Sequence, residues 1–356
     1  MSRIHHLTLR EFRCFESLEF EPGPSLNFII GANARGKSTI LEAACLLLRL
    51  RSPRTSNPSE MVRFGKNAFA LEGMAEGATE PLRLSLTWSP PLRLLKLDGV
   101  LQNSSREYLS LLSIVWFGTE DLSLVSGPAE RRRKLLDSAG LQMAGGYGHD
   151  LKQYERALRS RNLLLREGRP RREIEAYNIP LSETGERIVR ARHRLVALLS
   201  PLAQEACRNI SGETLDLAYI PGTTVPILDA LQNSRDEEIR LRQTQVGPHR
   251  DDITISLHGI AAGTFASEGQ RRTVALALKL ALALLLHQEN GHPPLLLLDD
   301  VFGELDPVRR EALLKGIPRH SQAFFSTTDL NGISLPEPSQ VHKLENGIIR
   351  STGNAD

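Results

Sequence analysis

Short segments in which apolar and polar residues alternate dominate the first hundred residues and predict β-structure. Residues 4–9 alternate in part, and residues 26–30 form a short apolar run, so each segment is a predicted strand. Similar alternations recur over residues 69–101, where Asp98-Gly99 is typical of a tight hairpin turn. We therefore expect a mainly antiparallel sheet over residues 69–101, beside the sheet that contains residues 26–30.

The pattern becomes helical between about residues 128 and 209. Apolar residues at helical spacing form two faces, the first with Leu151, Tyr154, Leu158 and Leu165, the second with Ile188, Leu195, Val196, Leu199 and Leu202. Gly168-Arg169-Pro170 breaks the pattern between the two faces. Two helices that pair into a short arm are the simplest geometry, because a few heptads are too few for a long coiled coil.

Strand-like patterns return after the helical segment. Residues 215–220 and 253–257 are predicted strands, residues 114–117 a predicted buried strand and residues 323–326 a last core strand, whereas residues 295–298 form a run of four leucines without alternation. Such runs are typical of strands that are buried on both faces of a parallel sheet. The apolar segment 274–286 contains Lys279 and is too short to span a bilayer, so we predict a buried helix.

Composition places the chain among ordinary globular proteins. Its 356 residues suggest about two domains, and 40% of them are hydrophobic and 24% charged. Cys14, Cys45 and Cys207 are odd in number and far apart, which indicates reduced thiols rather than a disulfide framework. No apolar secretory segment follows Met1, so we expect a cytoplasmic location.

A phosphate-binding motif follows the predicted strand 26–30. Residues 31–38 read Gly-Ala-Asn-Ala-Arg-Gly-Lys-Ser and fit the P-loop pattern, with a helical pattern after them. Backbone N–H groups at such a helix start bind anions, Lys37 would contact the β- and γ-phosphates, and Ser38 would complete a Mg²⁺ shell. The predicted nucleotide-binding residues are Gly31, Asn33, Ala34, Arg35, Gly36, Lys37, Ser38 and Thr39.

Two carboxylates end the apolar run 295–298 near the other end of the chain. Asp299 would emerge at the carboxyl edge of the sheet beside the P-loop, where it suits a Mg²⁺ ligand. Asp300 then points differently and is the candidate that activates an attacking water, so Asp300 and Lys37 are the catalytic candidates. The alternative is that two adjacent acids simply terminate a strand.

A third motif, Ser267-Glu268-Gly269-Gln270, opens the apolar helix. A serine at this place is usually only a helix N-cap. The order P-loop, serine motif, Asp pair resembles that of ABC-type ATPases, whose signature loop binds the γ-phosphate of a nucleotide held by the opposite subunit. By this resemblance Ser267, Gly269 and Gln270 bind nucleotide, and Asp306 faces the dimer partner; Asp306 can also initiate a helix before Pro307.

Motifs along most of the chain resemble the RecF family of bacterial recombination mediators, which is related to SMC proteins. The matching segments are Phe12-Arg13, 31–38 with Leu41-Glu42-Ala43, Ser52-Pro53-Arg54-Thr55, Glu120-Asp121-Leu122, 131–137, 247–252, 267–272, 299–306 and Thr327-Thr328-Asp329. The resemblance implies an α/β fold, with an ABC-type ATPase head of a mixed sheet and an antiparallel β subdomain. A helical arm is inserted into this head. We expect the head in residues 1–120 and 210–356 and the arm in residues 121–209.

The resemblance also implies an ATP- and Mg²⁺-dependent homodimer that closes on ATP, opens after slow hydrolysis and binds gapped or junction DNA. RecR, RecO and RecA are the implied partners, and no membrane is involved. Several residues depart from the pattern: Ala34 replaces a usual glycine, Arg35 adds a cation at the loop tip, and Glu268 places an anion in the signature loop. No glutamine near Gly118 matches a Q-loop, and Thr327-Thr328 stands where transporters have a switch histidine. These departures predict weak hydrolysis.

Charge is distributed unevenly although the net charge is only +2. The segment from Arg131 to Arg194 has eight more basic than acidic residues, which indicates an anionic partner or simply a solvated helical face. The few aromatic residues in this segment argue against base stacking, so phosphate contact without base readout is expected. The predicted DNA-binding residues are Arg131, Arg132, Arg133, Arg156, Arg159, Arg161 and Arg166.

Two other functions stay open from the sequence. A non-hydrolysing scaffold, in which ATP only locks a dimer, is compatible with Glu268, although Asp300 favours residual hydrolysis. A transporter nucleotide-binding subunit is disfavoured by the long insertion between the motifs and by the missing switch histidine.

Overall fold

The computed structural model describes residues 2–77, 80–104, 108–109, 112–143, 145–303 and 305–351, and its chain divides into two compact units. The first unit comprises Met1–Asp121, Asn209–Ser211 and Leu276–Asp356, and the second comprises Leu122–Arg208 and Gly212–Ala275. This division differs from the predicted domain boundaries, because residues 212–275 group with the helical segment instead of the head. The assignment of a functional head and arm stays a prediction.

The first unit contains the antiparallel sheet that the alternating pattern predicts. Its strand order is β2-β1-β4-β5-β6-β7, and all pairs are antiparallel. The strands are β1 (Arg3–Phe12), β2 (Phe15–Phe20), β4 (Phe69–Glu76), β5 (Leu82–Ser89), β6 (Leu92–Leu97) and β7 (Val100–Leu101). Asp98 and Gly99 join β6 to β7 with φ angles of 46° and 81°, the positive values that a two-residue hairpin turn requires.

A second, mostly parallel sheet lies in the same unit, in the order β15-β14-β3-β13-β12-β8. Its strands are β3 (Leu26–Ile30), β8 (Ile114–Phe117), β12 (Leu295–Asp299), β13 (Ala323–Thr327), β14 (Ser339–Glu345) and β15 (Ile348–Ser351). Only β15 pairs antiparallel, at the edge. The four leucines of β12 are buried, as an apolar run without alternation predicts.

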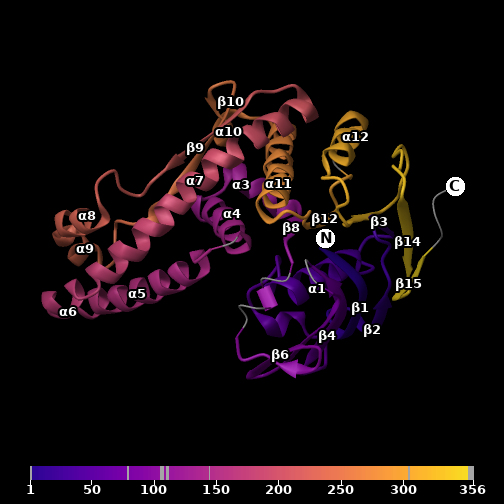
Figure 1. The fold of residues 1–356 in the computed structure, drawn as a ribbon, viewed down its shortest axis with the longest axis horizontal. Helices are drawn as coiled ribbons and strands as arrows, with labels where there is room; N and C mark the ends of the chain where they lie inside the picture. The colour runs from indigo at the N-terminus through magenta and orange to yellow at the C-terminus, as the bar shows by residue number, and fades with distance from the viewer. Residues whose placement is uncertain are drawn as a thin grey trace. The chain divides into compact units, whose positions relative to one another are not determined.

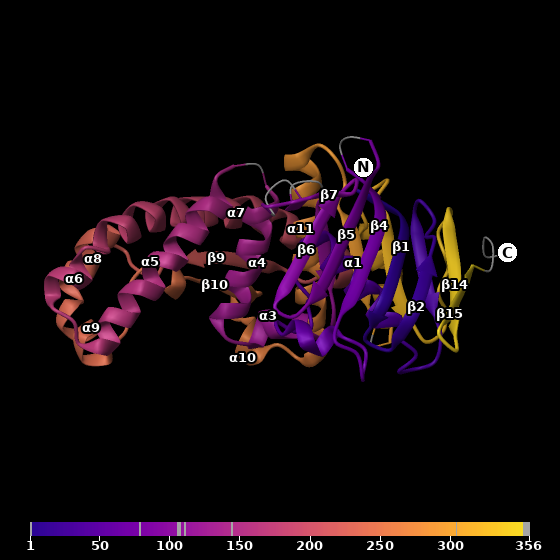
Figure 2. The same ribbon diagram turned by 90° about the horizontal axis from the view of Figure 1, so that it is seen from below.

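Helix α1 (Lys37–Arg49) contacts strands of both sheets, and one core cluster combines residues from all three layers. Figure 2 shows the antiparallel strands β1, β4, β5 and β6 side by side. The unit also contains η1 (Pro58–Met61) and α12 (Pro307–Gly316). Because α1 begins directly after the loop that follows β3, the apolar core fixes the start of this helix against the parallel sheet.

Helices dominate the second unit. They are α3 (Ser123–Ser126), α4 (Ala129–Gln142), α5 (Tyr147–Glu167), α6 (Arg171–Glu175), α7 (Asn178–Ser211), α8 (Ile227–Asn233), α9 (Arg235–Leu241), η3 (Pro248–Arg250) and α10 (Ala262–Phe265). A small antiparallel sheet has the order β11-β10-β9, with β9 (Leu215–Ile220), β10 (Asp252–Leu257) and β11 (Ile260–Ala261). Figure 1 shows α5 and α7 running side by side, and a shared apolar cluster with α8 holds them together.

Three elements connect the units along the chain, namely η2 (Thr119–Leu122), the last turn of α7, whose residues Asn209–Ser211 belong to the first unit, and the long helix α11 (Glu268–Asn290). Helix α5 ends at the predicted break, where Gly168 adopts a left-handed conformation with φ 64°. None of the helices in the described part of the chain combines the length and the apolar character needed to cross a membrane.

Candidate nucleotide site

The parallel sheet brings the P-loop and the Asp pair to one edge. The P-loop follows β3, Asp299 ends β12, and β13 lies between the two strands. In the register of the sheet, Ile30 pairs with Thr327 and Ser326 pairs with Asp299. Since these strands are parallel, their carboxyl ends meet at the same edge, as the motifs predict.

The P-loop backbone uses two left-handed residues. Ala34 has φ 60° and Gly36 has φ 104°. A Cβ atom on Gly36 would lie 2.6 Å from the Phe15 ring and 2.8 Å from the Cys14 sulfur, so only glycine fits there. Ala34 does adopt the positive φ for which a glycine is usual, and the left-handed conformation of an alanine costs about 1 kcal/mol.

Lys37 is buried at the start of α1 and points back into the loop. Its Nζ donates hydrogen bonds to the carbonyl oxygens of Gly31 at 2.7 Å and Ala32 at 3.0 Å. Burial lowers the pKa of Lys37, while the charges of Asp300 and Asp299 oppose this effect. The ammonium group thus lies within the electrostatic reach of both carboxylates, in a position to contact a phosphate bound by the loop.

Ser326, which is not among the predicted site residues, links the two carboxylate residues. Its hydroxyl donates to Asp299 Oδ1 at 2.6 Å and accepts from the backbone N–H of Asp300 at 2.9 Å. Asp300 itself has φ 53°, so its side chain leaves the line of β12. The signal in the sequence was the hydroxyl of Ser326 near the carboxyl end of β13, the strand that pairs with β12.

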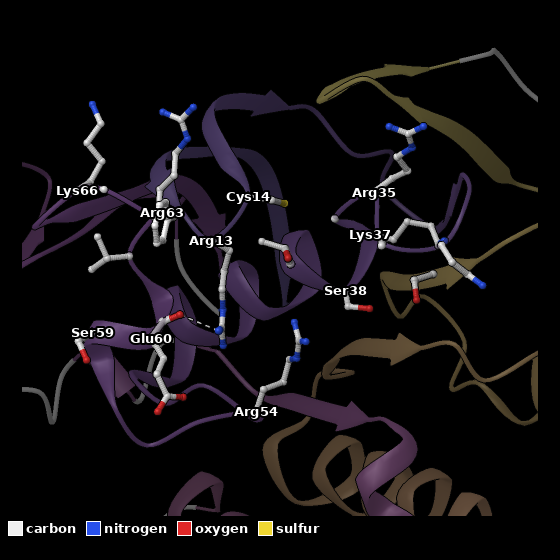
Figure 3. Close-up of a pocket in the computed structure, with 18 of the residues that line it drawn as sticks. Arg13, Cys14, Arg35, Lys37, Ser38, Arg54, Ser59, Glu60, Arg63 and Lys66 are labelled. Carbon is white, nitrogen blue, oxygen red and sulfur yellow. Dashed lines mark hydrogen bonds between the residues drawn. The ribbon is translucent and has the colours of Figure 1, made fainter.

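An open cavity of about 730 Å³ surrounds the P-loop within the first unit. Six cationic residues line it: Arg13, Arg35, Lys37, Arg54, Arg63 and Lys66. Ser38, Asp300 and Ser326 lie on its wall as well. Figure 3 shows Arg54 reaching toward Ser38, and Arg63 with Lys66 on the opposite side of the cavity from Arg35. This excess of positive charge suits a polyphosphate ligand.

Glu42 of α1 orients two of these arginines. Its carboxylate is fully buried and accepts a forked pair of hydrogen bonds from Arg13, at 3.0 and 2.6 Å. Arg54 reaches the same carboxylate at 3.3 Å, and the Ser52 hydroxyl donates to it at 2.5 Å. Arg13, Glu42 and Arg54 belong to three separate segments that match the family motifs. In the structure their side chains are in direct contact.

The Ser267 motif forms a helix cap, the usual role of a serine at the start of a helix. Ser267 Oγ accepts from the Gln270 N–H at 3.3 Å, and the Gln270 side chain accepts from the Ser267 N–H at 2.8 Å, which together make a capping box. Asp306 likewise caps α12 by accepting from the Arg309 N–H at 2.9 Å. Both caps are compatible with the predicted contacts of Ser267 and Gln270 to nucleotide and of Asp306 to a dimer partner. Those contacts stay predictions. Glu304 lies outside the described residues.

The seven predicted DNA-binding arginines have different environments. Arg131, Arg156, Arg159 and Arg166 are exposed. Arg132 forms an ion pair with Asp252 at 2.6 Å, and Arg133 donates to the Asp251 carbonyl at 2.7 Å.

Arg161 is buried, with 1% of its surface exposed, and pairs with Glu238 at 2.7 Å. Because its guanidinium is enclosed by protein, Arg161 cannot contact DNA, and this part of the prediction is corrected. The sequence contained a signal for this: at about 100° per residue, position 161 falls on the same face of α5 as Tyr154, Leu158 and Leu165.

The second unit also contains a buried polar network that the sequence did not predict. Arg192 donates to Asp137 at 2.6 Å and to Asp251 at 2.9 Å. His249 lies next to this network, accepts from the Tyr154 hydroxyl at 2.6 Å and donates to the Thr244 carbonyl. Burial lowers the pKa of His249 to about 4. His249, Asp251 and Asp252 of the 247–252 motif therefore have structural partners.

The parallel sheet around the P-loop, with α1 between two sheets, defines the class of this protein as an ATPase head of the SMC-like ABC type. A family model described as an AAA domain matches residues 6–100. The solved structure of an Smc head domain with an extended coiled coil, bound to the C-terminal domain of ScpA from Pyrococcus furiosus, shares this fold. It superposes with a TM-score of 0.61 at 16% identity, covering 99% of this chain and 96% of that one.

Comparison over the whole chain is more specific. The DNA replication and repair protein RecF of Bacillus cereus (strain AH820) is 34% identical over 97% of this chain and 98% of its own length, and that of Bacillus anthracis (strain A0248) matches equally well. The solved structure of the recombination mediator protein RecF-ATPrS in the RecFOR pathway has a TM-score of 0.90 at 30% identity, covering 99% of this chain and 98% of that one. The chain belongs to the RecF family.

Proposed function

We propose that this protein is an ATP-dependent DNA-binding protein of recombinational repair. It dimerises when it binds ATP, binds gapped or junction DNA, and helps RecR and RecO to load RecA. Slow hydrolysis of ATP then opens the dimer. The observation that carries the proposal is the single cavity in which the P-loop, Lys37 and Asp300 meet. The solved relatives RecF-ATP and RecF-ATPrS, both assigned to the RecFOR pathway, support it.

The residues of the cavity fit ATP with Mg²⁺. The P-loop amides and Lys37 hold the phosphates, and the surrounding arginines balance their charge. Ser38 and Asp299 would hold Mg²⁺, because hydroxyl and carboxylate oxygens are its preferred protein ligands. When bound, the ion neutralises charge on the β- and γ-phosphates. The hydrogen bond from Ser326 fixes the Asp299 carboxylate in advance.

Asp300 is the residue that accepts the proton of the attacking water. It lies on the cavity wall, and its positive φ turns it out of the strand that positions Asp299. Lys37 stabilises the charge that develops on the transferred phosphoryl group. Hydrolysis is weak because Glu268 brings a negative charge to the signature loop and Thr327-Thr328 replaces the switch histidine.

DNA binding is assigned to exposed arginines of the second unit. Arg131, Arg156, Arg159 and Arg166 are the exposed members of the predicted set, whereas Arg132 and Arg133 are half-buried and Arg161 is buried. Arginines on exposed helical faces contact phosphates without reading bases, so the binding is not sequence-specific.

A non-hydrolysing scaffold is the second candidate, and the exposed carboxylate of Glu268 favours it. In this case ATP locks the dimer but is not cleaved. A phosphate-release assay on the wild-type chain with gapped DNA separates the two candidates. Release that disappears in Asp300→Asn identifies an ATPase, whereas no release above background identifies a scaffold.

Light scattering on the full chain tests the proposed function. We expect a monomer without nucleotide and a dimer with ATP, Mg²⁺ and a gapped duplex. Lys37→Ala should lose ATP binding and stay monomeric, because the phosphates lose their main cationic contact, while Asp300→Asn should accumulate as a dimer. A wild-type chain that stays monomeric under all conditions would contradict the proposal.

A further inference from the structure

Six cationic side chains line the nucleotide cavity. Within the part of the chain that the structure describes, Arg35 is the one among them that forms no hydrogen bond or ion pair. Lys37 is bound by loop carbonyl groups, Arg13 and Arg54 by Glu42, and Arg63 and Lys66 by Glu11. Among the residues that the structure describes, none forms a hydrogen bond or ion pair with the exposed Arg35 side chain. Figure 3 shows it extending away from Ser38.

The backbone of the P-loop holds Arg35 in this outward position. It stands between Ala34 and Gly36, which are both left-handed, with φ 60° and 104°. Lys37 and the loop amides are the groups that face a bound phosphate, so Arg35 is not required for that contact. Because no described residue holds the exposed Arg35 guanidinium, it is available to a ligand outside the loop.

Glu268 is an exposed anion at the first residue of α11. Its side chain is 74% exposed, and the ion pair that the structure gives it is with Arg272, one helical turn further on, at 2.8 Å. The capping box of Ser267 and Gln270 fixes the backbone on both sides of it. An acid in the first turn of a helix is favourable in itself, so Glu268 has a local role as well.

We propose that Arg35 of one copy and Glu268 of a second copy form an ion pair that closes the ATP-bound dimer. This inference rests on the proposed ATP-bound dimer and on the arrangement that the ABC-type motif order implies, in which the Ser267 loop of one copy faces the nucleotide of the other. A two-fold dimer contains the pair twice, because a contact from one copy to its partner is repeated in reverse. The two departures from the family pattern are then complementary, since each supplies the charge that the other lacks.

The pair gives specificity as well as affinity. An exposed ion pair strengthens an association by about fivefold at most, whereas two like charges brought together weaken it much more. The dimer of this chain therefore selects a second copy that has an acid at the signature loop, and rejects one that has a base there. Because the pair is exposed, its contribution should fall as the salt concentration rises.

Charge reversal on the full chain tests the pair. We expect Arg35→Glu and Glu268→Arg each to raise the dimer dissociation constant by about 10- to 100-fold, because both sites then face like charges. The double variant should return to within about fivefold of wild type. Sedimentation at saturating, slowly hydrolysed ATP analogue measures the constant, and the nucleotide affinity of each variant is measured separately. Arg319→Glu and Glu289→Arg, which change the charge equally at exposed positions elsewhere, should stay within about twofold of wild type.

Mixing the two single variants shows whether the pair joins two chains. A mixed dimer contains one native pair and one reversed pair, so the equimolar mixture should dimerise about as well as wild type. An ion pair within one chain predicts no such rescue, and absence of rescue would overturn the inference. So would single variants that dimerise like wild type. Wild-type chains that fail to dimerise with nucleotide would overturn the proposed function as well, which keeps the two failures distinct.

Discussion

Arginines have opposite environments in the two units. In the first unit they line an open cavity, where Arg54 is 45% exposed and Arg63 is 32% exposed. In the second unit Arg161 and Arg192 are almost completely enclosed and each forms buried ion pairs. The difference means that the number of arginines in a segment does not by itself predict a binding surface, because burial removes some of them from contact with a ligand.

The buried network of the second unit pairs one arginine with two carboxylates. Arg192 lies between Asp137 and Asp251, and Asp251 also accepts hydrogen bonds from the Tyr219 hydroxyl and the Gly222 N–H. Burial raises the pKa of Asp251, and the Tyr219 hydrogen bond and Arg192 counteract part of that shift. Such a network has no spare charge for an external anion. The open cavity of the first unit, by contrast, exposes cations that a ligand can still engage.

Removing a buried arginine should have the largest effect on stability. Arg161→Ala leaves the Glu238 carboxylate buried without its partner, so we expect the free energy of unfolding of the second unit to fall by about 3–5 kcal/mol. Arg159→Ala, on the exposed face of the same helix, should change it by less than about 0.5 kcal/mol. Urea titration followed by far-ultraviolet circular dichroism measures both.

Tryptophan fluorescence makes this prediction specific to one unit. Trp88 and Trp116 are the two tryptophans of the chain, and both belong to the first unit. The fluorescence transition should therefore shift less than the helical signal in Arg161→Ala. An equal shift of both signals would show that the two units unfold together, and that the loss of stability is not confined to the second unit.

Buried histidines should make stability fall in weak acid. Burial lowers the pKa of His342 to about 4, and its ring is fully enclosed between Asn27 and Ser351. Between pH 6.5 and 4 the unfolded chain takes up a proton that the folded chain does not, so this stability is present above pH 6.5 and is lost as pH falls. The loss is about 3 kcal/mol by linkage.

The measurement compares urea midpoints by tryptophan fluorescence at several pH values from 7 to 4. His342→Gln should lower the stability of the first unit at pH 7. It should also make the urea midpoint of this unit fall less steeply as the pH decreases. Burial also lowers the pKa of His249 in the second unit to about 4. His249→Gln should therefore reduce the pH dependence of the midpoint only when unfolding is followed by circular dichroism of the helices. A decline that neither substitution alters would assign the acid sensitivity to other groups.

Local patterns were sufficient to predict the elements around the nucleotide site. The strands β3, β12 and β13 are apolar runs that end at motifs, and their common edge follows from parallel pairing. The Asp98-Gly99 turn and the helix break at Gly168 depend on backbone preferences of single residues. These features are local in the sequence, and a sequence therefore reveals them.

Partners that are distant in the chain were not predictable in this way. Glu238 is 77 positions from Arg161, and nothing in either segment indicates the other. Residues 212–275 join the second unit because β10 packs on α4 and Asp252 pairs with Arg132. Ser326 is one short polar residue in an apolar strand, and its role emerges only when β13 lies beside β12.

The two left-handed positions of the P-loop should respond differently to substitution. Gly36→Ala forces a Cβ against Phe15 in a left-handed conformation, and should destabilise the first unit by about 2 kcal/mol and abolish ATP binding. Ala34→Gly relieves about 1 kcal/mol of backbone strain but makes the unfolded chain more flexible, so the net change should be below about 0.5 kcal/mol. Thermal unfolding and nucleotide titration measure both, and tight ATP binding by Gly36→Ala would contradict the loop geometry.

The smallest effects concern the exposed arginines of α5. Arg156, Arg159 and Arg166 lie on one side of the helix, opposite the face that contains Arg161, so replacing each by alanine should leave the fold intact. If each contacts one phosphate, each loss reduces the slope of log affinity against log salt by about one unit. Fluorescence anisotropy with a gapped duplex at several salt concentrations measures the slope, with Arg319→Ala as an exposed control in the first unit. An unchanged slope in the triple variant would show that α5 is not the DNA-binding surface. Exposed and buried arginines of this helix would then differ only in their effect on stability.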